Sequence, residues 1–193
     1  MKHTVVALVE DKPGVLNRVA SLFRRRGFNI DSLAVGTTHE PGVSRMTIVI
    51  EGNENIADQL EKQLFKLIDV IKVENFTNQN AIMRELALIK VKASTQNRRE
   101  ILDILEVFRA QPIDLSTASL VIQIVAHRDT IDALIENLSR FGILEMVRTG
   151  RIAMRRGYTT TTDEVLDEED NYSTNFHSQL GRLSNGNFPF VSD

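Results

Sequence analysis

The sequence predicts an α+β protein made of two successive βαββαβ units and a polar C-terminal tail. Short apolar runs alternate with stretches in which apolar residues recur every three or four positions, which are the patterns of strands and amphipathic helices. The same order of elements occurs twice within 193 residues, a length that suits two small domains. The composition, with 42% hydrophobic and 25% charged residues, is typical of a globular protein.

The first unit begins with an apolar strand, a turn around Pro13 and Gly14, and a helix that Gly27 ends. Two strands, a second helix and a fourth strand follow. This order gives a four-stranded antiparallel sheet with two helices on one face, the ferredoxin-like arrangement. The expected elements are a strand at 2–9, a helix at 14–26, strands at 28–35 and 44–51, a helix carrying Ile56, Leu60, Leu64 and Leu67, and a strand at 70–76.

The second unit repeats the order of elements with different residues. We therefore expect a first domain at 2–76, a linker at 77–83, a second ferredoxin-like domain at 84–156 and a tail at 157–193. The expected elements are a strand at 85–93, a helix at 97–109, strands at 112–115 and 119–126, a helix capped by Asp129, and a strand at 143–148 that residues 151–154 extend.

The tail is polar and acidic, with too few apolar residues to form a core. Such a composition predicts disorder. Docking through Phe188-Pro189-Phe190 is the alternative interpretation.

The totals exclude several classes of protein. The net charge of −3 indicates neither a nucleic-acid partner nor an anionic membrane surface, and the absence of cysteine excludes disulfides and a thiolate nucleophile. The N-terminus has no apolar signal core, and no run is long enough to span a bilayer, so we expect a cytoplasmic protein. The four histidines are scattered, and no nucleotide-binding loop or nucleophile elbow occurs, so we expect neither a metal site nor catalytic residues.

RNA binding is another role of βαββαβ sheets, which stack bases on aromatic residues of their central strands. The strands at 2–9 and 44–51 contain no aromatic residue, which disfavours that role. The triplet Arg24–Arg26 has two interpretations, since it either complements the dipole at a helix end or forms a phosphate-binding patch.

The turn at 11–14 is the candidate functional stretch. The first turn of a helix leaves backbone N–H groups unpaired, which favours an anion, and Gly14 has no side chain to obstruct a ligand. The turn either holds a small carboxylate, such as an amino acid, or is an ordinary capped loop. The second unit has Ser94–Asn97 at the equivalent place, which suggests that the first unit alone carries the ligand.

Several segments together resemble the regulatory small subunit of acetolactate synthase (acetohydroxyacid synthase), and the resemblance covers residues 2 to about 156. The turn alone indicates an ACT domain, the amino-acid-sensing module. The segments that carry the resemblance are 9–16, 22–33, 44–48, 61–64, 66–70, 84–91 and 148–150.

This resemblance implies a non-catalytic subunit of branched-chain amino acid biosynthesis, which activates the catalytic subunit and confers feedback inhibition by valine. Thiamine diphosphate, FAD and magnesium would then belong to the catalytic partner, and the compartment would be the cytoplasm, or the plastid stroma if the protein is organellar. It also implies a homodimer of ACT domains paired edge to edge. The alternatives are an ACT-domain regulator of transcription or metabolism with another partner, and a stand-alone enzyme.

The resemblance also implies where valine binds, between the turn of one chain and the second strand of the other. The carboxylate would meet the N–H groups near Gly14, and Asn29 would bind the amine or the carboxylate. Relatives often have Asn in place of Asp11. The carboxylate of Asp11 can pair with the ammonium of the ligand or repel its carboxylate, so the choice of ligand stays open. The expected effector-binding residues are Asp11, Lys12, Pro13, Gly14, Val15, Asn29, Ile30 and Val35.

Overall fold

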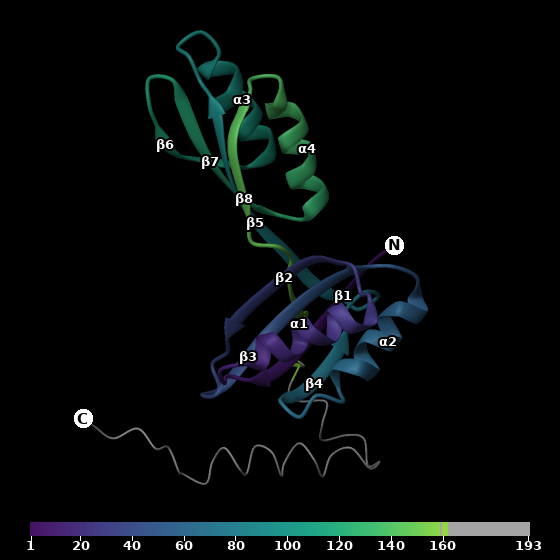
Figure 1. Cartoon of the computed structure of the whole chain (residues 1–193). Coiled ribbons are helices and arrows are strands. Elements are labelled where there is room, and N and C mark those ends of the chain that lie inside the picture. The colour runs from purple at the N-terminus through teal and green to yellow at the C-terminus, as the bar shows by residue number, and fades with distance from the viewer. Residues whose placement is uncertain (159, 162–193) are drawn as a thin grey trace, which may run out of the picture. The chain divides into compact units, whose positions relative to one another are not determined.

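The computed structural model describes residues 1–158, 160 and 161, which form two compact units (Figure 1). The first unit comprises residues 1–31 and 35–81, with the described residues from 154 onward. The second comprises residues 82–153 together with 32–34. Most of the expected tail, including Phe188–Phe190, lies outside the described residues.

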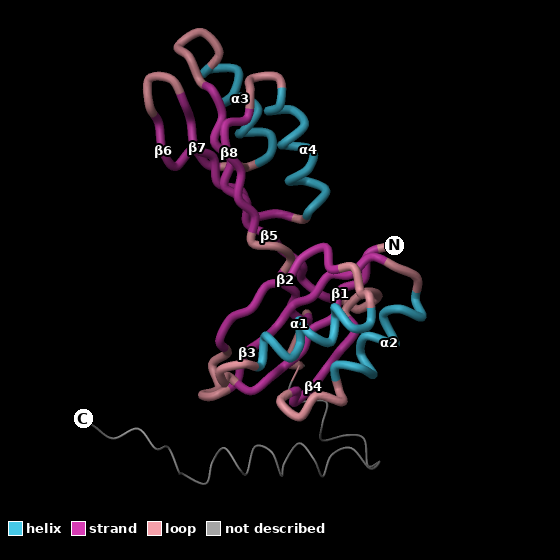
Figure 2. The backbone as a smooth tube through the Cα atoms, in the orientation of Figure 1, coloured by secondary structure: helices cyan, strands magenta, loops and turns pink. Residues whose placement is uncertain are grey.

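The first unit is a four-stranded sheet with the strand order β2-β3-β1-β4. The central strand β1 is antiparallel to both neighbours, and its register with β3 runs from Lys2 opposite Glu51 to Glu10 opposite Val43. Both helices cover one face of this sheet (Figure 2). The elements are β1 (Lys2–Glu10), α1 (Val15–Arg26), β2 (Ile30–Thr37), β3 (Val43–Glu51), α2 (Glu54–Leu64) and β4 (Val70–Asn75).

The strand β1 is buried on both of its faces. Val5 and Ala7 are fully buried, and so is Val6, whose side chain points to the opposite face because side chains alternate along a strand. An apolar run of this kind is typical of a strand at the centre of a layered core. The sheet of the first unit therefore has protein on both sides.

Residues that follow the second unit in sequence return to the first unit. Arg155 donates two hydrogen bonds to Oε1 of Glu74 on β4, one of them from Nε at 2.7 Å. The N–H of Arg156 donates to the Asn80 carbonyl at 3.1 Å, and Arg45 donates to Oγ1 of Thr161 at 3.1 Å. Because Glu74 is only 7% exposed, the ion pair with Arg155 compensates a buried carboxylate.

The second unit has the strand order β6-β7-β5-β8, and β9 pairs with β5. Two helices again cover one face of the sheet (Figure 1), and Ile89, Ile122 and Leu134 are fully buried in the core between them. The elements are β5 (Ala81–Lys92), α3 (Arg98–Phe108), β6 (Gln111–Leu115), β7 (Ser119–Ala126), α4 (Arg128–Ser139), β8 (Ile143–Arg148) and β9 (Ile152–Arg155).

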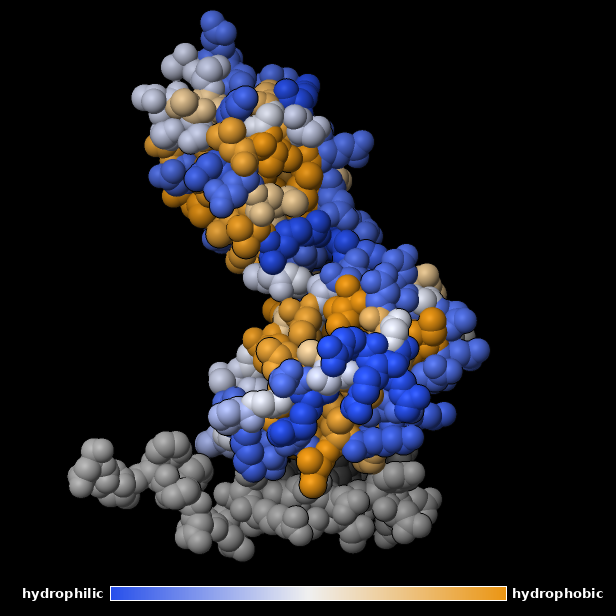
Figure 3. Space-filling model, in the orientation of Figure 1, coloured by the Kyte–Doolittle hydropathy of each residue, from blue (hydrophilic) through white to orange (hydrophobic). Residues whose placement is uncertain are grey.

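The second unit also exposes large apolar side chains. Figure 3 shows apolar surface on its visible side, between hydrophilic residues. The exposed apolar residues of this unit include Val107, Leu115, Val125 and Val147.

The predicted fold class is confirmed: both units are ferredoxin-like, with the element order expected from the sequence. Several boundaries were wrong. The expected strand at 28–35 begins at Ile30, because the N–H of Phe28 donates to the Phe23 carbonyl and completes the end of α1. The helix α1 begins at Val15, directly after its N-cap Gly14, as expected.

Four further boundaries also differ from the expected ones. The strand β5 begins at Ala81, four residues before the expected start, and pairs with β9. The strand β9 is separate and does not extend β8 as predicted. The last helix is capped by His127, so Asp129 lies in its first turn, and α2 ends at Leu64.

Candidate functional site

The turn between β1 and α1 is exposed, but its backbone is anchored to two neighbouring loops. The N–H of Asp11 donates to the Gly42 carbonyl at 2.8 Å, in the connection between β2 and β3. The N–H of Glu10 donates to the Asp69 carbonyl at 2.9 Å, in the loop before β4. The turn is therefore an exposed segment in a fixed position.

Gly14 is the N-cap of α1 and has a left-handed backbone, with φ +90° and ψ −13°. This conformation is strained for residues with a Cβ. A Cβ built on Gly14 would meet no atom closer than Nη1 of Arg18, at 3.6 Å. The backbone conformation, and not crowding, is thus what requires glycine here.

The backbone of the turn leads directly into the helix. The carbonyl of Gly14 accepts the N–H of Arg18 at 3.0 Å, and the N–H of Val15 donates to the Lys12 carbonyl over a long 3.4 Å. The N–H groups of a first helical turn have no carbonyl four residues before them, so they favour an anion at this end of α1.

Two ion pairs flank the turn. Lys12 Nζ lies 2.9 Å from Oε2 of Glu10. Arg18 donates to both oxygens of Asp69, from Nε at 2.5 Å and from Nη2 at 2.7 Å. The hydrogen bond to Asp69 raises the pKa of Arg18, so this cation stays charged at any physiological pH.

The sequence interpretation missed Arg18 and Asp69. They are 51 residues apart, so no local pattern joins them. The available signal was the position of Arg18 four residues after Gly14, which places both on the same side of the helix start.

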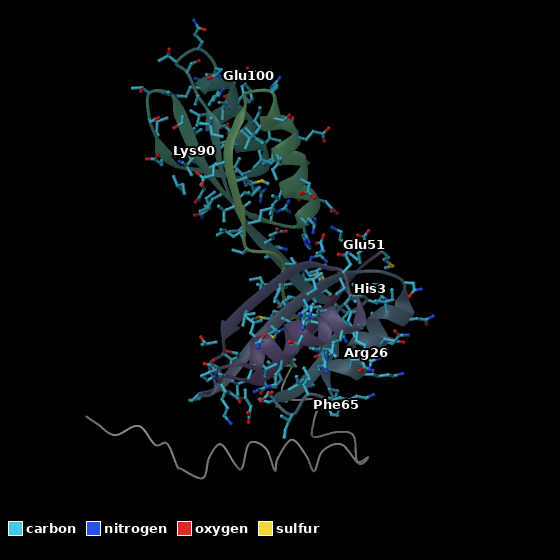
Figure 4. All side chains as sticks on the ribbon, in the orientation of Figure 1. His3, Arg26, Glu51, Phe65, Lys90 and Glu100 are labelled. Carbon is cyan, nitrogen blue, oxygen red and sulfur yellow. The ribbon has the colours of Figure 1, made fainter. Side chains whose placement is uncertain are left out.

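The expected site residues on β2 lie far from the turn within one chain. The carbonyl of Asn29 accepts the N–H of Glu51, which is opposite Lys2 at the start of β1, whereas the turn follows the end of β1. A nine-residue strand spans about 30 Å. Figure 4 labels His3 and Glu51, which lie at this end of the sheet. The structure thus groups residues 11–15 and leaves Asn29 and Ile30 at the opposite end.

The apolar candidates differ in exposure. Val15 is 3% exposed and packs in the core, so its side chain is directed away from solvent. Ile30 is half-buried, and Val35 is 47% exposed on β2. Val35 is also nearer the turn than Asn29, since Thr38 bonds to Val43 at the end of β3 that lies beside Glu10.

The equivalent turn of the second unit is internally bonded. The N–H and the hydroxyl of Ser94 both donate to Oδ1 of Asn97, at 2.7 and 3.2 Å. An open hollow of about 560 Å³ adjoins this turn, where the N–H and the hydroxyl of Ser94 are already bonded to Asn97. It is lined by Lys92, Ser94, Asn97, Thr117, Ala118, Phe141 and Leu144.

Within residues 1–158, 160 and 161, no group of three or more His, Asp or Glu side chains is placed to hold a metal ion. No helix in the same part of the chain is long and apolar enough to cross a membrane.

Two family models match the chain. Residues 6–72 match the "AHAS small subunit-like ACT domain", and residues 84–157 match the "Small subunit of acetolactate synthase". The two matches cover both helices and most of the sheet of each unit.

Individual relatives match over nearly their whole length. A probable acetolactate synthase small subunit of Archaeoglobus fulgidus is 50% identical over 157 residues, which are 81% of this chain and 98% of that protein. The acetolactate synthase small subunit of Mycolicibacterium smegmatis is 48% identical over 155 residues, covering 80% of this chain and 91% of that one. The crystal structure of the Thermotoga maritima acetolactate synthase small subunit has a TM-score of 0.76 and 40% identity, over 82% of this chain and 99% of that chain.

Proposed function

This chain belongs to the family of acetolactate synthase small subunits, and we propose that it activates an acetolactate synthase catalytic subunit and makes that enzyme sensitive to inhibition by valine. The observation that carries the effector part of the proposal is the glycine-opened start of α1, where an exposed, anchored turn adjoins a helix N-terminus. A small carboxylate is the ligand that such a helix start favours.

In this proposal valine binds at the 11–15 turn. Its carboxylate meets the N–H groups at the start of α1, and its ammonium lies near the carboxylate of Asp11. Because the side chain of Val15 is buried, that residue contributes its backbone. The isopropyl group packs against Ile30 and Val35, and Asn29 provides a polar contact.

A second copy of the chain must supply the β2 residues, because Asn29 and Ile30 lie at the far end of the sheet from the turn of their own chain. The strand β2 is an edge of its sheet, and an unpaired edge favours association with another strand. Pairing of two β2 strands around a two-fold axis would extend the sheet and give a homodimer. The dimer and the effector site are therefore one proposal.

The free energy available from valine is sufficient for regulation. Burial of a branched aliphatic side chain contributes about 1.5–3 kcal/mol. Couplings between an effector and a distant site are typically about 1–3 kcal/mol. Valine binding at the dimer edge is thus able to shift a two-state regulator.

The chemistry of the reaction belongs to the partner in this proposal. Thiamine diphosphate, FAD and magnesium are bound by the catalytic subunit, and this chain contributes no catalytic residue. The second unit takes part in binding the catalytic subunit, and both subunits work in the cytoplasm, or in the plastid stroma for an organellar protein.

The test is reconstitution. The purified chain is mixed with an acetolactate synthase catalytic subunit, and acetolactate formation is measured with and without valine. We expect the chain to raise the activity and valine to lower it again. Valine binding with no effect on the synthase would favour the alternative, an ACT-domain regulator of another partner. If the chain neither binds valine nor activates the catalytic subunit, the proposal is refuted.

A further inference from the structure

One arginine lies directly behind the 11–15 turn. Arg18 is one helical turn after Gly14, and its Nη1 is the atom nearest to the position of a Cβ on Gly14, at 3.6 Å. Its side chain is 49% exposed. The guanidinium therefore borders the same solvent-accessible space as the backbone of Gly14.

A buried carboxylate fixes the direction of this guanidinium. Asp69 is 6% exposed and accepts hydrogen bonds from Nε and Nη2 of Arg18. The guanidinium is a planar fork, so a bidentate pair at one edge sets the orientation of the third nitrogen. Among the described residues these two bonds account for the hydrogen bonding of Arg18, and Nη1 remains on the side of Gly14.

The charges around the turn suit a zwitterion better than a simple anion. Glu10 with Lys12 and Asp69 with Arg18 form two neutral pairs. Asp11 is exposed and, within the described part of the chain, takes part in no ion pair, which leaves one net negative charge. A ligand with a carboxylate alone is repelled by this charge, whereas an α-amino acid offers its ammonium to Asp11 and its carboxylate to Arg18.

We propose that Arg18 is a specificity-determining residue of the effector site, which binds the carboxylate of a zwitterionic amino acid through Nη1 while Asp69 positions it. This inference rests on the proposed function and names the side chain that recognises one end of the effector. It predicts that the site distinguishes an amino acid from the same molecule without a free carboxylate.

The test compares valine with valinamide, in which the carboxylate is replaced by a neutral amide. Binding of both is measured by titration calorimetry to the full chain and to Arg18→Met. The full chain binds valine more tightly than valinamide by about tenfold or more, the size of one charge-assisted hydrogen bond. Arg18→Met removes the share of that preference that Arg18 supplies, whereas the share from the N–H groups at the start of α1 remains. The matched control is Arg26→Met, because Arg26 is an exposed arginine in the last turn of the same helix (Figure 4). This control variant keeps the full preference for valine over valinamide.

Asp69→Asn separates ligand recognition from a structural role. It keeps the charge of Arg18, so the preference for valine over valinamide persists even if both affinities fall. If Arg18→Met is unstable because Asp69 is left buried and unpaired, the double variant Arg18→Met/Asp69→Asn replaces it.

The outcomes are distinct. Equal losses of valine and valinamide affinity in Arg18→Met and Asp69→Asn would show that the pair only supports the turn, and would overturn this inference alone. Failure of the unmodified chain to bind valine would overturn the proposed effector and, with it, the role of Arg18.

Discussion

Replacing Gly14 with Asp and with Asn separates charge from backbone strain at the proposed effector site. The two side chains have nearly the same shape, so both variants meet the same left-handed backbone at φ +90°. That conformation costs about 1–2 kcal/mol for most residues and less for Asn and Asp, which tolerate it. Space is available, since the nearest atom to an added Cβ is 3.6 Å away. Both variants are therefore expected to fold, because domains are stable by about 5–15 kcal/mol.

The charge of Asp distinguishes the two variants. A carboxylate about 4 Å from the valine carboxylate costs about 1 kcal/mol at the dielectric constant of water and about 4 kcal/mol at an effective value near 20. The turn is exposed, so the lower part of this range applies. We expect Gly14→Asp to weaken valine binding by about 1–2 kcal/mol more than Gly14→Asn does, a difference of roughly 5- to 30-fold.

The assay measures acetolactate formation by a catalytic subunit with each variant over a range of valine concentrations. Activation in the absence of valine reports whether the variant folds and assembles. The expected result is activation by both variants, with half-inhibition shifted to much higher valine for Gly14→Asp. Unchanged valine sensitivity in Gly14→Asp, or an equal shift in both variants, would refute an anion site at this turn.

Three other predictions concern stability and the tail. Arg155→Met removes the ion pair of the buried carboxylate of Glu74, and we expect it to lower the free energy of unfolding by about 3–5 kcal/mol in urea titrations. Arg99→Met, which removes an exposed ion pair, should change this free energy by less than about 1 kcal/mol. Equal effects would contradict the role given to Glu74. Burial, followed by repulsion from Asp58 and Glu74, raises the pKa of Glu61, so the folded state binds this proton more tightly than the unfolded state. Glu61→Gln should therefore stabilise the protein at neutral pH, with a gain that disappears as the pH falls from the raised pKa through the ordinary value of 4.5; a gain that grows in acid would reverse this sign. A chain ending at Thr161 should still activate the catalytic subunit, and a loss of activation on this truncation would assign a function to residues 162–193.

The element order was predictable because it depends on local periodicity. The apolar residues of α1 recur at helical spacing, and the strands alternate or form short apolar runs. The turn at Gly14 was also predictable, since a glycine between a strand and a helix has a limited set of roles.

Features that depend on distant partners were not predictable. The early start of β5 is coupled to pairing with β9, about 70 residues later. The ion pair of Arg18 with Asp69 joins the start of a helix to a loop before another strand. The separation of Asn29 from the turn follows from the register of β1 with β3, which local patterns do not reveal.

The return of Arg155 to Glu74 has a consequence for biosynthesis. The ribosome completes the four strands of the first unit at residue 75, but Arg155, which forms the ion pair with Glu74, is translated about 80 residues later. At about 5–20 residues per second, the nascent sheet waits roughly 4–16 s before Arg155 is available to pair with Glu74. A recombinant fragment that ends at residue 76 would never gain the ion pair with Arg155. The sheet of such a fragment should therefore be less stable to unfolding than the same sheet in the intact chain.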